Sequence, residues 1–284
     1  MKKLMFTAAV AAAMGAFAIE SANVVGYTTK TIPAGKYMMI GVQFDTTAGA
    51  AMNADQAFKL DKAGHAWESA DAPECIPNWY TTAPCIKIPY GTVNMGYRDL
   101  YYAEDACDAD DNYALKPGWA DQFGMLVKAP ALLSGYGVWL VAGSEALTVT
   151  IAGQVKAAAS DAITGGAGYN LMRLPYPVAI NAGDSKINWN LSSQAGQAWE
   201  SPDAPECIPN WFATAPCLKI PYGTVDQGYR DLYYAQDACD ADDNYALKPG
   251  WADQFGMLVK NAVIPEGMGF WLVLPAANTA TVTK

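Results

Sequence analysis

The feature that most constrains the fold of this chain is a long internal repeat. Residues Ala66–Lys128 recur as Ala198–Lys260 without a gap, and only 7 of the 63 aligned positions differ. Duplication on this scale is typical of binding arrays and structural building blocks, because one catalytic centre rarely needs two copies of its surroundings. We call each repeated segment a cassette, and we expect it at the centre of one module. The predicted modules span residues 23–155 and 156–284.

The sequence that flanks the cassettes has diverged much further. Between Tyr37–His65 and Tyr169–Gln197 only 4 of 29 positions match. Recent exchange between the copies explains this contrast without selection, and retention of a working surface explains it equally well.

Short strand-like segments indicate an all-β fold. Asn23–Lys30, Tyr37–Phe44 and Leu147–Val155 are rich in β-branched and aromatic residues, and Gly or Pro bounds them. The chain holds 25 glycines and 17 prolines, which favours many short strands over long helices. Only Ala48–Leu60 has weak helical character. We predict two homologous, sandwich-like β modules in tandem, with short helices at most.

The N-terminus has the pattern of an export signal. Lys2 and Lys3 precede the apolar stretch Leu4–Ala18, and a small-residue cleavage motif ends at Ala22. The sequence therefore predicts a signal peptide over residues 1–22 and a secreted or cell-surface location. We expect no transmembrane segment after removal of the signal peptide. A retained signal anchor is the alternative. The net charge of −10 and only three arginines argue against a nucleic-acid partner.

The cysteines come in two sets of three, an odd number for each cassette. In an oxidising compartment such residues pair. Each module then closes at most one internal bridge, for which we favour Cys75–Cys85 and Cys207–Cys217. The third cysteine of each set would bridge modules, bridge molecules or stay free. The six disulfide candidates are Cys75, Cys85, Cys107, Cys207, Cys217 and Cys239.

The ends of each module resemble an uncharacterised family of exported bacterial β-rich proteins. The matching motifs are the opening segment Asn23–Tyr27, the turn Pro33–Tyr37, the closing segments Gly135–Leu140 and Gly267–Leu272, and the strands Thr148–Thr150 and Thr281–Thr283. The resemblance covers the framework and not the cassettes. It implies a secreted β-rich repeat protein and no particular activity.

Residues suited to catalysis are few, and we name no catalytic residue. The only histidine, His65, is replaced by Gln197 in the second copy, so a nucleophile triad lacks its base. The repeated acids Glu68, Asp71 and Glu74 leave a secreted glycoside hydrolase open, because that chemistry needs only two carboxylates. Solvated loop acids are the alternative, and we predict that the protein is not an enzyme.

An acidic run in each cassette has the oxygen-ligand spacing of a calcium loop. The glycine and the closing glutamate of the full helix–loop–helix motif are both missing. A solvated turn whose Asp side chains cap their own backbone is the alternative. No cofactor is required, and calcium is the one candidate. Its ligands would be Asp108, Asp110 and Asn112, and Asp240, Asp242 and Asn244.

Aromatic residues are the third notable group in the cassettes. Flat rings stack on sugars and also serve protein partners at low entropy cost, and the alternative is that they fill the core. Trp119 follows Lys116-Pro117-Gly118, which reads as a turn, so we expect it to be exposed. We expect Arg98 and Asp99 to form a structural ion pair. The candidate ligand-binding aromatics are Trp67, Trp79, Trp119, Trp199, Trp211 and Trp251.

These observations predict a non-catalytic structural or adhesive protein of the cell surface, the extracellular matrix or a filament. Its partners would be further copies of itself or surface components. The second hypothesis is a calcium-assisted glycan-binding protein with one site in each module, where two sites together gain avidity.

Overall fold

The computed structural model describes residues 25–68, 74–201 and 204–284, so the predicted signal peptide and Asp71 lie outside the described residues. The predicted all-β class is confirmed, since antiparallel sheets carry nearly all the regular structure. Within the described residues the one α-helix is the short α2 (Ala54–Ala57), which lies in the segment with weak helical character.

Each cassette contributes most of a five-stranded antiparallel sheet. In the N-terminal half the strand order is β2-β8-β5-β6-β7, and in the C-terminal half it is β11-β20-β16-β17-β18. The registers agree, since Cys85 pairs with Tyr101 and Cys217 pairs with Tyr233. The first sheet comprises β2 (Tyr37–Ile40), β5 (Cys85–Pro89), β6 (Tyr97–Asp108), β7 (Ala114–Ala120) and β8 (Val138–Val141). The second comprises β11 (Gly168–Arg173), β16 (Cys217–Pro221), β17 (Tyr229–Asp240), β18 (Ala246–Ala252) and β20 (Gly269–Leu274).

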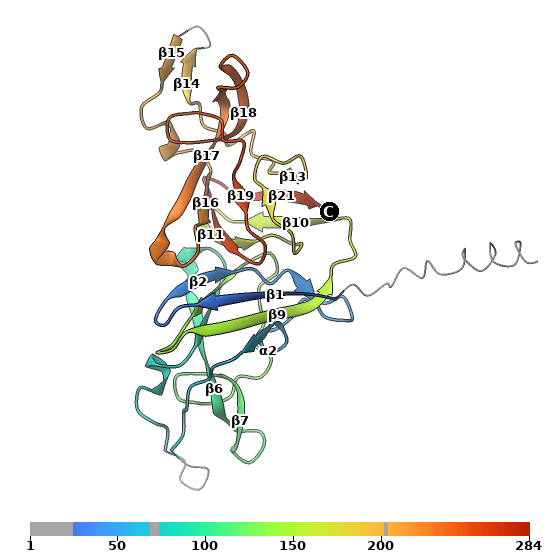
Figure 1. The fold of residues 1–284 in the computed structure, drawn as a ribbon, viewed down its shortest axis with the longest axis vertical. Coiled ribbons are helices and arrows are strands. Elements are labelled where there is room, and N and C mark those ends of the chain that lie inside the picture. The colour runs from blue at the N-terminus through green and yellow to red at the C-terminus, as the bar shows by residue number, and fades with distance from the viewer. Residues whose placement is uncertain (1–24, 69–73, 202–203) are drawn as a thin grey trace, which may run out of the picture.

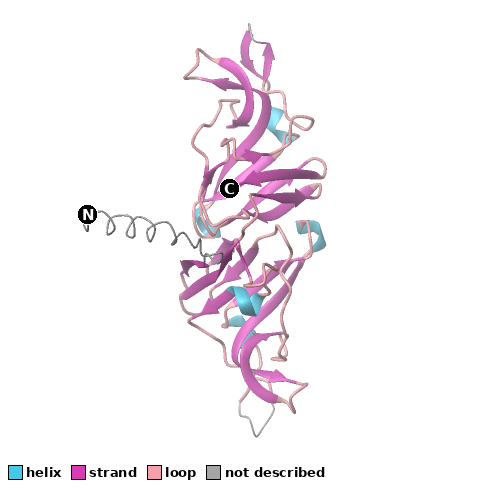
Figure 2. Cartoon of the chain, turned by 90° about the vertical axis from the view of Figure 1, so that its right-hand side faces the viewer, coloured by secondary structure: helices cyan, strands magenta, loops and turns pink. Residues whose placement is uncertain are grey.

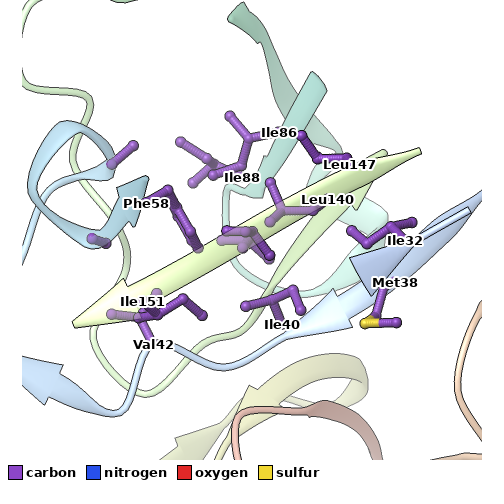
Figure 3. Close-up of a cluster of buried hydrophobic side chains, with 14 of the residues drawn as sticks. Ile32, Met38, Ile40, Val42, Phe58, Ile86, Ile88, Leu140, Leu147 and Ile151 are labelled. Atoms are coloured by element: carbon purple, nitrogen blue, oxygen red, sulfur yellow. The ribbon is translucent and has the colours of Figure 1, made fainter. Parts of the chain in front are cut away.

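A second sheet packs against each five-stranded sheet, as in a sandwich. In the N-terminal half the inward side chains of the two sheets meet in one apolar core (Figure 3), to which Ile86, Leu140 and Ile151 belong. The C-terminal half has a matching core around Phe270. The covering sheet of the N-terminal half comprises β1 (Val25–Ile32), β3 (Phe44–Asp45), β4 (Phe58–Leu60) and β9 (Leu147–Val155). That of the C-terminal half comprises β10 (Ser160–Gly165), β13 (Ile187–Asn188) and β21 (Asn278–Thr283).

Two small strand pairs and four short 3-10 helices complete the described fold. The pairs are β12 (Ile180–Asn181) with β19 (Val263–Ile264), and β14 (Trp199–Ser201) with β15 (Ala204–Cys207). The 3-10 helices are η1 (Trp79–Thr81), η2 (Val93–Met95), η3 (Trp211–Ala213) and η4 (Val225–Gln227).

The two halves meet across a pseudo-two-fold axis. A small apolar cluster at this seam consists of three repeat pairs, each made of a residue and its counterpart 132 positions later: Met39 with Leu171, Tyr97 with Tyr229, and Trp139 with Trp271. The two indole rings pack edge to face, with their centroids 5.7 Å apart. When matching residues of two units meet in this way, the contact is isologous, as in a symmetric dimer.

Backbone hydrogen bonds across the seam repeat the same symmetry. Gly41 N donates to Gly267 O at 3.0 Å, and the counterpart residue Arg173 donates from its N to Gly135 O at 3.1 Å. The chain at the end of β2 in one half and at the end of β11 in the other is thus held in the same way. Equivalent residues of the two halves thus make reciprocal contacts, as the subunits of a symmetric dimer do.

The cassettes differ from one another where each meets the framework of the opposite half. Asp226 of η4 pairs with Lys36, with 2.8 Å between Oδ2 and Nζ. The first cassette has Asn94 at this position, and it lies near Gly168, the counterpart of Lys36. One of the seven substitutions in the repeat is therefore explained by the seam.

The pseudo-two-fold axis places the two cassettes at opposite ends of an elongated molecule. The β6–β7 hairpin lies at one end of the longest axis, and β14, β15 and β18 lie at the other (Figures 1 and 2). Among the described residues, no helix is both long and apolar enough to cross a bilayer.

Candidate functional site

The tip of the β6–β7 hairpin exposes a tyrosine in an unfavourable backbone conformation. Asn112 and Tyr113 both have positive φ, 47° and 61°, and Ala114 N closes the turn on Asp111 O at 2.9 Å. The left-handed conformation costs a residue with a Cβ roughly 1–2 kcal/mol, and Tyr113 nevertheless leaves its side chain 66% exposed. In the second cassette Tyr245 repeats this arrangement, with φ 59°.

A second exposed ring lies on the neighbouring turn. Asp121 Oδ1 accepts hydrogen bonds from the backbone N–H groups of Phe123 and Met125, which fixes the turn and leaves Phe123 exposed. Cys107 ties the two turns together, because its N donates to Gly124 O at 2.8 Å and its Sγ lies 3.7 Å from Tyr113 O. We call Tyr113 with Phe123 an end patch. The second end patch consists of Tyr245 and Phe255, which are equally exposed.

Lysines neutralise the acidic run beside each end patch. Asp108 is buried, and its two oxygens lie 2.8 Å from Lys128 Nζ and 2.9 Å from Lys116 Nζ. These two contacts lower the pKa of Asp108 to about 2. The same lysines also reach Asp111 and Asp110, and the second cassette repeats the network around Asp240.

The lysine network bears directly on the predicted calcium loop. In the described residues, no group of three or more His, Cys, Asp or Glu side chains is placed to hold a metal ion. A calcium ion at Asp108 would first have to displace two ammonium groups from it. Calcium binding stays a prediction, and the structure gives the crowded carboxylates another source of charge compensation.

The candidate tryptophans are almost entirely buried. Trp199 is half-buried, and the other five are at most 8% exposed. Edge-to-face contacts hold Trp119 against Phe58 and Tyr102, so it belongs to the sandwich core. These five rings present little surface on which a sugar could stack, although Trp251 borders a cavity in the C-terminal half.

The expectation that Trp119 is exposed is wrong. Pro117 and Gly118 do not form a turn but continue β7. This is allowed because β7 lies at the edge of its sheet, where a proline need not donate a hydrogen bond. Trp119 consequently points to the inner face.

All six cysteines are free thiols in the structure. Cys85 lies in the middle of its sheet, where burial raises its pKa to about 12. Cys107 and Cys239 are 2% and 4% exposed, so neither is placed to form a bridge between molecules unless the cassette end opens. The expected pairing Cys75–Cys85 is not present.

The carboxylates considered for glycoside hydrolysis do not form a site in the described residues. Glu68 and Glu74 are both exposed, and their contact is between backbone atoms, with Glu68 N donating to Glu74 O at 3.3 Å. His65 Nδ1 lies 2.7 Å from Asp105 Oδ2, and Asp105 also accepts hydrogen bonds from two backbone N–H groups. Asp105 therefore holds the backbone of Ala66 and Trp67 in place at the start of the cassette.

The expected ion pair between Arg98 and Asp99 is replaced by another. Asp99 pairs across the strands with Lys87, with 2.5 Å between Oδ2 and Nζ. Neighbouring residues on a strand point to opposite faces of the sheet, so Arg98 lies on the other face and does not reach Asp99.

Sequence reasoning missed the end patches and their lysines. A bulky residue in the left-handed region carries no signal in the sequence, so the exposure of Tyr113 could not be foreseen. The lysines could have been found, since Lys116 follows the acidic run closely in both copies. Comparison with protein-family models, curated proteins and solved structures finds no match for this chain.

Proposed function

We propose that this chain is an exported, non-catalytic structural or adhesive protein whose copies associate end to end through the two end patches. One observation carries the proposal: the turns of the β6–β7 and β17–β18 hairpins lie toward opposite ends of the elongated molecule (Figure 1), and the same pair of exposed rings, Tyr113 with Phe123 and Tyr245 with Phe255, belongs to each hairpin turn and the turn beside it. A molecule with one such surface at each end joins two neighbours.

The chemistry of an end patch suits contact with a second copy of itself. Large rings contribute contact area at low entropy cost. Around them, the exposed carboxylates of Asp111 and Asp110 pair with the half-exposed ammonium groups of Lys116 and Lys128. Two patches that meet face to face can set the acids of one against the lysines of the other.

The backbone strain at Tyr113 supports a role for its side chain. An observed outlier of this kind is a reason to infer function, because structural needs alone would favour glycine there. Its repetition at Tyr245 means that both ends keep the same unfavourable conformation.

The symmetry determines what such contacts would build. When two identical patches bind each other, each molecule still has a free patch at its far end. The assembly therefore does not stop at a closed dimer. The product is an open linear chain of copies, which suits a filament or a matrix.

Sedimentation velocity of the mature full chain over a range of concentrations tests this proposal, with Tyr113→Gly, Tyr245→Gly and the double variant alongside. Glycine removes the ring and relieves the backbone strain, so the variants stay folded. We expect the wild type to form a concentration-dependent ladder, each single variant to stop at a dimer, and the double variant to remain monomeric. A wild type that is monomeric at every concentration, or a double variant that still forms the ladder, would refute the proposal.

A further inference from the structure

A cavity of about 390 Å³ opens in the C-terminal half, between the cassette and its framework. The cassette side is formed by Tyr234, Pro249 and Leu258, and the framework side by Asp184, Ser185 and Asn188. Its volume falls within the usual range of small-ligand sites, roughly 300–1,000 Å³. None of these residues belongs to an end patch.

In the N-terminal half, a different framework segment lies beside the matching cassette strand, and Gly118 is buried where Gly250 is half-buried. The two frameworks can be aligned by equivalent hydrogen bonds: Ala54 N donates to Pro130 O, and Ala182 N donates to Ala262 O, both at 2.8 Å. After Ala54 the chain forms α2, which packs against β7, and then places Phe58 on Trp119.

After Ala182 the chain takes a different course. Ala182 is followed by Gly-Asp-Ser-Lys, four residues, before Ile187 of β13. In the N-terminal half, five residues separate Ala54 from Leu60 of β4. This segment forms no helix and brings no large apolar side chain, although Trp189 further on packs on Trp251. The two nearly identical cassettes therefore meet framework segments of different length and course. The framework side of the cavity is specific to the C-terminal half, so we expect one site among the described residues.

The cavity combines apolar and polar lining residues. The half-buried ring of Tyr234 and the side chains of Pro249 and Leu258 form the apolar part. On the opposite side, Asp184 Oδ1 accepts from Lys186 N and Asn188 Oδ1 accepts from Asn190 N, at 2.9 and 3.1 Å. These bonds hold a carboxylate and an amide in place at the edge of the cavity.

The charges around the cavity disfavour an anionic ligand. The one ammonium group in its lining, that of Lys260, lies 2.6 Å from Asp240 and 3.0 Å from Asp242. Asp184 would repel a second carboxylate. A neutral ring with one apolar face and a rim of hydroxyl groups matches both walls.

We propose that this cavity is a binding site for a neutral hexopyranose, as a monosaccharide or the end unit of a glycan, with one site per chain. The sugar's apolar face lies against Tyr234 and Pro249. Its hydroxyl groups bond with Asp184 and Asn188. No calcium takes part, and the site does not depend on end-to-end association.

The repeat supplies a matched control for the test. We would titrate the full mature chain by isothermal calorimetry with glucose, galactose, mannose, cellobiose and maltose. The variants are Ser185→Trp, which fills the cavity from an exposed position, Tyr234→Ala, which removes the stacking ring, and Tyr102→Ala as the identical change in the first cassette. Thermal unfolding of each variant without sugar shows whether it is folded.

We expect at least one sugar to bind with a stoichiometry of one. Tyr234→Ala should weaken binding at least about tenfold because the stacking ring is lost, Ser185→Trp should abolish it, and Tyr102→Ala should leave it unchanged. The absence of binding by all five sugars, a stoichiometry of two, or undiminished binding by a folded Ser185→Trp variant would overturn the proposal. None of these outcomes bears on the sedimentation experiment, so the two proposals fail separately.

Discussion

The contact between Trp139 and Trp271 is the sharpest test of the pseudo-two-fold seam. Trp271 is 9% exposed, and a buried aromatic side chain removes about 150–250 Å² from water. At about 25 cal/mol per Å², that burial and the cavity left by truncation make Trp271→Ala cost about 3–5 kcal/mol. Trp139 is half-buried, so we expect Trp139→Ala to cost about half as much, roughly 2 kcal/mol.

The informative quantity is the coupling between the two changes. An edge-to-face pair contributes about 0.5–1.5 kcal/mol beyond its buried area, and this amount is lost once in either single variant. The double variant should therefore be less destabilised than the sum of the single variants by about 0.5–1.5 kcal/mol.

Urea unfolding of the four proteins, followed by far-ultraviolet circular dichroism, gives these free energies. Trp139→Ala combined with Phe255→Ala is the control, since Phe255 lies exposed at a cassette end, and we expect that pair to be additive within about 0.5 kcal/mol. Additivity of Trp139→Ala and Trp271→Ala would refute the reasoning, because it would mean that the rings do not meet. A split into two transitions would show instead that the halves unfold separately once the seam is weakened.

Three further predictions concern the charges, the backbone and the thiols. The lysine contacts of Asp108 lower its pKa to about 2 from an ordinary 3.8. The stabilising effect of this carboxylate is therefore complete above about pH 5 and is lost as the pH falls toward 2. Asp108→Asn should flatten this part of the dependence of Tm on pH. Gly143→Ala would place a Cβ 1.8 Å from Thr82 O, so we expect a loss of more than about 3 kcal/mol in chemical denaturation, whereas Gly183→Ala meets nothing closer than 3.7 Å and should be nearly neutral. In the reduced native protein, a thiol-specific reagent should modify the half-buried Cys75 well before Cys85, which is buried and whose pKa is about 12; equal rates would show that the sheet opens readily.

The framework strands were predictable because their residue types determine them locally. Leu147–Val155 is β9 with the expected bounds, since alternating β-branched residues fit a sheet that is buried on one face. Within the described residues the single α-helix also lies in the segment with helical character.

Features that depend on the tertiary context could not be predicted in the same way. Trp119 was misplaced because Pro117 and Gly118 indicate a turn unless one knows that their strand is at a sheet edge. The cavity depends on a framework segment one residue shorter than its counterpart, and the end patches depend on a left-handed tyrosine. Neither leaves a pattern that local propensities detect.

The ion pair between Lys36 and Asp226 has a consequence for how the halves recognise each other. If the N-terminal half met a copy of itself across the same seam, Lys36 would face the amide of Asn94, and its charge would lack a counterpart. If the C-terminal half met its own copy, Asp226 would face Gly168. The two halves therefore present different side chains at one position of an otherwise symmetric contact. This difference favours docking of the two halves within one chain during folding over exchange of halves between chains.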